Sequence, residues 1–253
     1  MKVIASNLIT TVSASSSNAN YPDDNLLDKH PKKIWKSSGT TAEITFDIQG
    51  GTSNAFALFN TNATGVSYDF RDPNYVVWEA GVDWEDGVEW SVNEVTISET
   101  TNLDGVNGSC LAEWSDFTGT VQLIVSLSCA TGEVLFAGVA VAGDLNIYPG
   151  PSYGFTETGI DYSETSQLSN GSIYIKDRDQ VRDFAISATV SMTEFNTFIG
   201  SVWKTLGSYP TAWVMTDESD SRWLVYGMFT KPPSGKMLYN DLVSLTFNVT
   251  EVI

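Results

Sequence analysis

A break near residue 150 limits the possible folds of this chain more than any other feature of its sequence. Residues 148–154 read YPGPSYG, and two prolines with two glycines in so short a run can continue neither a strand nor a helix. Before the break the sequence shows short strand patterns, whereas a helix pattern appears among the strands after it. We therefore predict two domains, residues 1–150 and residues 151–253.

The charge of the chain disfavours two classes of partner. The sequence has 31 Asp and Glu against 13 Lys and Arg, a formal net charge of −18 at pH 7. Nucleic acids and anionic membranes are bound mainly through Lys and Arg, so we expect neither as a partner. No apolar run approaches the 18 residues of a membrane span, and the start lacks the apolar core of a secretory signal. We therefore expect no membrane insertion and synthesis in a cytoplasm.

Residues 1–150 predict a β-sandwich or jelly roll. Ile44, Phe46 and Ile48 alternate with polar residues, which is the period of a half-buried strand. A Gly-Gly pair at 50–51 follows, and we expect the strands on either side of it to pair across a tight connection. Seven or eight short strands without a helix period are typical of these folds. The predicted strands are residues 42–48, 55–59, 66–70, 88–97, 108–114, 121–129 and 134–141.

The entry to this first domain resembles discoidin-like (galactose-binding-like) jelly rolls. Residues 25–28 read NLLD, Trp35 follows, and then comes the strand over residues 42–48. In that family a turn of this type leads to a Trp and then to a strand of the Thr-Ile-Asp-Leu type. Residues 28–33, DKHPKK, replace the usual Asp-Gly-Asp turn, so the resemblance does not extend to a calcium site there.

An aromatic and acidic segment, residues 75–90, carries the candidate interaction residues. Trp78, Trp84 and Trp90 are six residues apart, so a strand would place all three on one side. Such side chains pack a core or anchor a subunit interface, and when exposed they offer a platform for sugars; the alternatives stay open. The neighbouring carboxylates match no metal-binding spacing. We expect an acidic loop there, no bound metal and no cofactor.

Residues 151–253 predict a small α+β domain with one helix on an antiparallel sheet. Ser191 and Glu194 have the spacing of a capping box, and Gly207 is placed to end the helix. A single apolar stripe predicts one buried face, formed by Phe195, Phe198, Ile199, Val202 and Leu206. The predicted strands are residues 172–176, 184–190, 212–215, 222–229 and 242–249, with a loop at residues 231–236.

The order of the two domains resembles that in structural proteins of tailed bacteriophages. The resemblance rests on the break at 148–154, on Arg178 and Arg182 before the helix, and on the final strands. In those proteins a discoidin-like domain precedes a small α+β domain. The resemblance implies a virion component of the tail or tail tip that assembles with copies of itself and other virion proteins. The alternative is a carbohydrate-binding or adhesin module, and the two roles are compatible because a tail protein can also contact a host glycan.

No catalytic constellation is apparent in the sequence. The one histidine, His30, lies between Lys29 and Pro31 without an evident Ser or Asp partner. Zinc-helix and phosphate-loop patterns are also missing from the sequence. We therefore expect no enzyme and no catalytic residue. Cys110 and Cys129 lie in strand-like segments, and we expect both to be free thiols.

Overall fold

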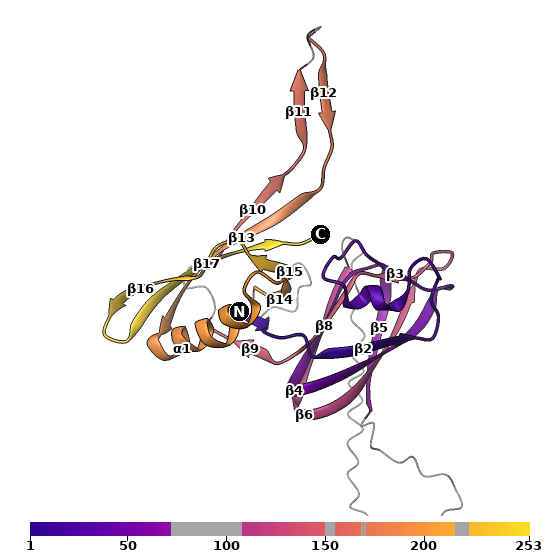
Figure 1. The fold of residues 1–253 in the computed structure, drawn as a ribbon, viewed down its shortest axis with the longest axis horizontal. Helices are drawn as coiled ribbons and strands as arrows, with labels where there is room; N and C mark the ends of the chain where they lie inside the picture. The colour runs from indigo at the N-terminus through magenta and orange to yellow at the C-terminus, as the bar shows by residue number, and fades with distance from the viewer. Residues whose placement is uncertain (72–107, 150–154, 168, 170, 216–222) are drawn as a thin grey trace, which may run out of the picture. The chain divides into compact units, whose positions relative to one another are not determined.

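The computed structural model describes residues 1–71, 108–149, 155–167, 169, 171–215 and 223–253 (Figure 1). The chain is mainly β and divides by packing into two compact units. We call Leu8–Leu27 with Lys33–Gly143 the jelly-roll unit. Met1–Asn7, Asp28–Lys32 and Asp144–Ile253 form the C-terminal unit. The predicted fold class is confirmed: a jelly roll followed by a smaller α+β part with a helix packed on an antiparallel sheet.

The jelly-roll unit is built on a five-stranded sheet of order β2-β4-β6-β5, in which β8 pairs with the second half of β4. A two-stranded sheet, β3 with β7, lies in the same unit, and a short 3-10 helix η1 joins β2 to β3. The elements are β2 (Ile9–Ala14), η1 (Asp23–Leu27), β3 (Trp35–Lys36), β4 (Thr41–Thr61), β5 (Ala63–Arg71), β6 (Gly108–Cys129), β7 (Phe136–Ala137) and β8 (Val139–Gly143).

The core of this unit forms from the alternating residues that the sequence singled out. Ile44, Phe46 and Ile48 are buried against the matching apolar residues of β6. Trp35 is fully buried, and its indole Nε1 donates to Ser17 Oγ at 2.9 Å, so the one polar atom of its ring has a partner inside the fold.

The prediction that residues 42–48 and 55–59 pair with each other is wrong. Both belong to the single long strand β4, which pairs with β6 on either side of the Gly-Gly pair. Gly50 has φ +93° and the register shifts between Ile48 and Gly51, so the two glycines make a β-bulge and not a hairpin turn. Gly119, with φ +132°, lies opposite Gly51 in β6. The two strands therefore bend together and remain paired.

The C-terminal unit has an eight-stranded antiparallel sheet of order β10-β13-β17-β15-β14-β1-β9, with β16 paired to β17. A separate two-stranded hairpin, β11 with β12, continues from β10 and β13. The strands are β1 (Lys2–Ile4), β9 (Leu145–Ile147), β10 (Phe155–Asp161), β11 (Glu164–Gln167), β12 (Ile173–Lys176), β13 (Gln180–Ser191), β14 (Thr211–Val214), β15 (Leu224–Phe229), β16 (Ser234–Tyr239) and β17 (Leu242–Glu251).

Residues 1–7 pack with the C-terminal unit, whereas the sequence grouped them with residues 1–150. Strand β1 lies between β14 and β9 and pairs with both. Val3 and Ile4 are fully buried there, and the Thr211 hydroxyl donates to the Ile4 carbonyl at 2.5 Å. The first strand of the chain is therefore an interior strand of a sheet whose other strands come from residues 145–253.

The helix begins where the sequence predicts. The Ser191 hydroxyl accepts from the Glu194 amide at 3.1 Å, and the Glu194 carboxylate accepts from the Ser191 amide at 2.7 Å. The helix comprises α1 (Met192–Thr197), the π-helical segment η2 (Phe198–Trp203) and α2 (Lys204–Leu206), and Gly207 follows with φ +55°. Of the predicted stripe, Phe198, Val202 and Leu206 are buried on the sheet, and Phe195 and Ile199 are half-buried.

The loop predicted at residues 231–236 is shorter than expected. Residues from Ser234 onward form β16, which turns back to pair with β17 as a hairpin. Gly235 explains why the strand fits: a Cβ at this position would lie 2.5 Å from the Phe195 ring. A larger side chain would have to displace the Phe195 ring, so glycine allows β16 to lie directly on the start of the helix.

The two cysteines are free thiols, as expected, but their surroundings differ. Burial raises the pKa of the Cys110 thiol to about 11. Partial burial and then the Glu133 carboxylate raise the pKa of Cys129, which is in part accessible. We predict that a maleimide labels Cys129 in the folded protein more slowly than an unfolded thiol, and that Cys110 is labelled after denaturation. Mass spectrometry checks this; prompt double labelling of the folded chain would contradict it.

Candidate functional site

The interaction residues proposed from the sequence, Trp78, Trp84 and Trp90, lie outside the described residues, and their role stays a prediction. His30 is exposed. The described residues contain no group of three or more His, Cys, Asp or Glu side chains placed to hold a metal ion. The helices in the described part of the chain all lack the length and apolar character needed to cross a membrane.

The hairpin β11–β12, which we call the arm, projects from the sheet of its unit (Figure 1). Every residue of its two strands is exposed. Ile173, Tyr174 and Ile175 leave 66%, 56% and 57% of their surface in solvent, values that are unusual for three consecutive large apolar residues. An isolated two-stranded hairpin is marginally stable in water. Burial of the arm against another molecule is therefore energetically favourable.

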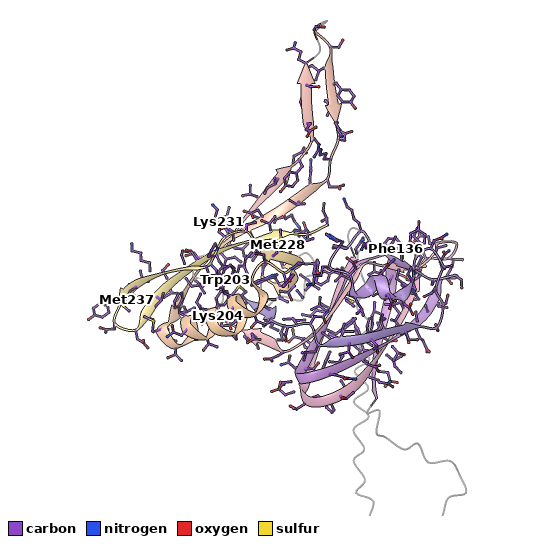
Figure 2. The ribbon with its side chains drawn as sticks, viewed as in Figure 1. Phe136, Trp203, Lys204, Met228, Lys231 and Met237 are labelled. Carbon is purple, nitrogen blue, oxygen red and sulfur yellow. The ribbon has the colours of Figure 1, made fainter. Side chains whose placement is uncertain are left out.

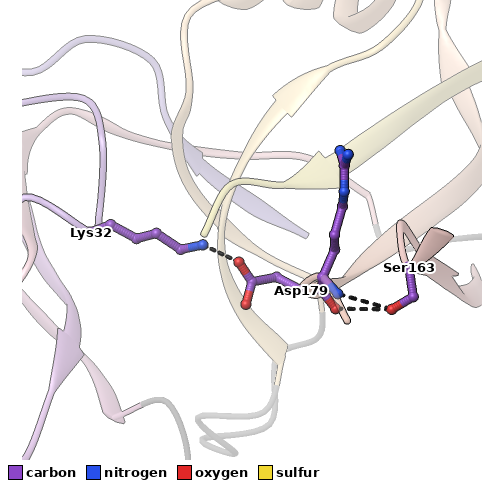
Figure 3. A network of polar contacts seen from close by, with 4 residues as sticks. Lys32, Ser163 and Asp179 are labelled. Atoms are coloured by element: carbon purple, nitrogen blue, oxygen red, sulfur yellow. Dashed lines mark hydrogen bonds and ion pairs between the residues drawn. The ribbon is translucent and has the colours of Figure 1, made fainter. Parts of the chain in front are cut away.

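A polar network fixes the base of the arm (Figure 3). Ser163 Oγ accepts from the Arg178 amide at 3.0 Å, which bridges the two strands where β10 passes into β11. Lys32 forms an ion pair with Asp179 on the other side of the same bend. Asp161 accepts from the Ser163 amide at 2.8 Å and from the Gln180 side chain at 3.0 Å, and these bonds lower the pKa of Asp161. These contacts tie the two strands together at the base of the arm.

The hairpin β16–β17 presents a second apolar surface on the same unit, which we call the β16 patch. Met237, Leu238, Tyr239 and Leu242 are exposed, with Tyr239 at 72%. Figure 2 labels Met237 on the projecting end of this hairpin. Within the described residues β16 pairs on one side, with β17, so its other edge offers free backbone donors and acceptors.

The base of the arm and the β16 patch differ in charge. Residues 155–183, which include the arm and its base, carry six acidic and three basic side chains. Residues 229–242, around the β16 patch, carry Lys231 and Lys236 against Asp241. Both lysines are exposed. The acidic excess lies at the base of the arm, since the described strands of the arm carry one acidic and one basic side chain, Glu164 and Lys176.

A polar groove of about 600 Å³ lies on the outer face of the jelly-roll sheet. Its hydroxyl groups and one carboxylate come from four strands or their ends, and cross-strand pairs such as Glu43 with Ser126 and Thr41 with Ser128 place them in rows. The polar side chains that line it are Ser15, Thr41, Glu43, Ser67, Ser126 and Ser128. A groove of this size and lining suits a neutral or cationic polyhydroxyl ligand, because its charged group is a carboxylate.

Part of this arrangement had a signal in the sequence. Residues 172–176 were predicted as a strand, and Asn-Gly at 170–171 is a turn sequence. The preceding strand β11 has the sequence ETSQ, which lacks apolar residues, so the hairpin itself was missed. The β16 patch was missed because Pro232 and Pro233 indicated a loop.

Comparison with known proteins found structural likeness without sequence relatives. No family model matches the sequence, and no curated protein matches it. A chitosan-binding module of a chitosanase/glucanase from Paenibacillus sp. IK-5 is similar at 18% identity and a TM-score of 0.40, covering 55% of this chain and 99% of that one. A family 32 carbohydrate-binding module of Clostridium perfringens NanJ, in complex with galactose, is similar at 13% identity and a TM-score of 0.34, covering 58% and 100%.

A third similar structure comes from a complex between two proteins. A chain from the complex of reduced XRCC1 with the DNA polymerase β catalytic domain is similar at 12% identity and a TM-score of 0.37, covering 54% of this chain and 97% of that one. The likeness to all three extends over about half of this chain. At these identities and TM-scores it carries no argument about a ligand or a partner.

Proposed function

We propose that this chain is a non-enzymatic structural protein that acts by assembling, as a component of a phage virion in the tail or tail tip. Its assembly contacts are made by the C-terminal unit, and the jelly-roll unit remains free to touch other molecules. The virion setting comes from the order of the domains in the sequence. The assembly role is supported by the described surfaces.

The observation that carries the proposal is the exposed apolar arm. Three consecutive large apolar residues on a projecting hairpin do not stabilise a monomer, because their side chains remain in water. An exposed strand of this kind tends to pair with another chain. The network at its base ties its two strands together, which reduces the conformational entropy that is lost when it docks. The arm thus has both the driving force and the preorganisation of an assembly contact.

The test replaces the apolar side chains of the arm. We expect the wild-type chain to sediment as an oligomer at micromolar concentrations, and the triple variant Ile173→Ser/Tyr174→Ser/Ile175→Ser to sediment as a monomer of unchanged melting temperature. The matched control is Ile147→Ser, which removes one exposed apolar side chain elsewhere on the same unit. Analytical ultracentrifugation over a concentration series measures both. A monomeric wild-type chain at every concentration would refute the proposal.

Glycan binding is the second candidate function, and the polar groove favours it. Hydroxyl and carboxylate groups in rows suit the hydroxyls of a sugar chain. Sugar chains are neutral, cationic when they contain amino sugars, or anionic when they contain uronic acids. The carboxylate of Glu43 selects among these chemistries, because it attracts a cationic amino sugar and repels an anionic uronic acid.

We predict that an amino-sugar oligosaccharide binds the groove, and that Glu43→Gln weakens this binding at least tenfold. The loss of one charged hydrogen bond is worth about 1.5–3 kcal/mol, which is roughly a factor of ten or more. Thr45→Ser, on the same strand but outside the groove lining, is the control. Isothermal titration with chitosan and pectin oligosaccharides measures the affinities. Equal affinity of the wild type and the Glu43→Gln variant would show that the groove is not the glycan-binding site.

A further inference from the structure

We propose that the arm of one copy docks along the β16 patch of a second copy, so that a strand of one chain extends the sheet of the next. This inference rests on the proposed assembly function and names the surfaces that meet. The partner is therefore a second copy of this chain, and the contact is between two different surfaces.

Both hairpins have free strand edges at which such a contact can form. The arm's strands pair with each other, and β16 pairs with β17, so within the described part of the chain each hairpin keeps an outer edge. A strand added to an exposed edge satisfies the backbone donors and acceptors of both. The side chains then meet in alternation, with the isoleucines of β12 beside the apolar residues of β16.

The apolar surface on the two hairpins is large enough for a stable contact. The arm contributes Ile173, Tyr174 and Ile175, with Tyr162 at its base, and the β16 patch contributes four more exposed apolar side chains. Together they expose on the order of 800 Å² of apolar surface, which is the upper limit of the apolar area that the contact can bury and corresponds to an interface at the smaller end of the standard range.

The charges favour the arm meeting the β16 patch over the arm meeting another arm. The described strands of the arm carry one acidic and one basic side chain, Glu164 and Lys176, and the excess of three acidic side chains lies at the base, whereas the patch segment has an excess of one lysine. Two arms that lie side by side in parallel would bring their acidic bases together, which is unfavourable. An arm on a β16 patch instead brings an acidic base toward a segment with an excess of lysine.

A contact between two different surfaces has a consequence for symmetry. Each copy donates its arm to one neighbour and accepts the arm of another, so all apolar hairpins are covered by a single kind of contact. Repetition of such a head-to-tail contact gives a closed ring, or an open filament where the rotation does not close. Either product suits a structural component built from many copies.

The test uses cross-linking between two full-length variants. Ser166→Cys places a thiol on the arm, and Leu238→Cys places one on the β16 patch, both in a Cys129→Ser background so that the native accessible thiol does not react. A bis-maleimide is added to each variant alone and to a mixture. We expect a cross-linked dimer in the mixture, at least tenfold above the amount in either variant alone.

Two outcomes would overturn the inference and leave the assembly function standing. One is a cross-link in Ser166→Cys alone, which would mean that arm meets arm. The other is an oligomeric mixture by ultracentrifugation with no cross-link between arm and patch. A mixture that stays monomeric in the same ultracentrifugation run would instead refute the proposed function, so the two failures are distinguishable.

Discussion

Deletion of residues 2–7 will unfold the C-terminal unit and leave the jelly-roll unit folded. The deletion removes β1 from between β14 and β9, so both neighbours lose a line of backbone hydrogen bonds. It also removes the fully buried side chains of Val3 and Ile4. Burying one such side chain is worth about 1.5–3 kcal/mol, and the exposed backbone groups add to that cost. The loss approaches the whole stability of a small unit, about 5–15 kcal/mol.

Circular dichroism and proton NMR of the deletion variant measure this effect. We expect the helix signal to disappear and the dispersed resonances of the jelly-roll unit to remain. A synthetic peptide of residues 1–7 added in excess should partly restore the helix signal, because it supplies the missing strand. Substitution of Lys2 by Ser is the control, since β1 keeps its backbone there. A deletion variant with a full helix signal would contradict the placement of β1.

Substitution of Trp213 by Ala will lower the free energy of unfolding of the C-terminal unit by about 4 kcal/mol. The Trp213 ring is fully buried and packs edge-on against Phe229, with centroids 5.0 Å apart. Its Nε1 donates to the Gly227 carbonyl at 3.0 Å, so the substitution also leaves that acceptor without its donor. Phe229 packs in turn on Phe198 of the helix, so the cavity left by the ring lies in the core between the sheet and the helix.

Urea unfolding followed by the helix signal measures this prediction. The control is Tyr209→Ala, whose ring is mostly exposed and whose loss we expect to cost less than 1 kcal/mol. The unfolding of the jelly-roll unit, followed through labelling of Cys110, should be the same in both variants. A Trp213→Ala change below about 1 kcal/mol would show that the ring does not hold the sheet and helix together.

The sequence predicted the elements that are determined by their own local residue pattern. The capping box at Ser191 and the apolar stripe after it located the helix, because both signals are local. The strands with alternating apolar residues, such as β17 and the first half of β4, were located for the same reason. The break at 148–154 likewise separates two differently patterned parts of the chain.

Elements determined by distant partners were missed or misplaced. Strand β1 has three residues, and its neighbours β14 and β9 lie more than 140 positions away, so no local pattern marks it. A Gly-Gly pair is compatible with a hairpin turn and with a bulge, so residues 50–51 alone do not distinguish the two. The pairing of β4 with β6 on both sides of the pair makes it a bulge. The exposure of Ile173 to Ile175 could not be predicted, because a local run of large apolar residues predicts burial.

Hydrogen exchange of the full-length wild-type chain, compared between dilute and concentrated solution, tests the assembly account most directly. Strand pairing between copies slows exchange of the amides that it covers. We predict that the amides of 164–167, 173–176 and 234–239 become protected as concentration rises, while those of β4 and β6 exchange at an unchanged rate. Exchange at all of these amides that does not depend on concentration would contradict assembly through these hairpins.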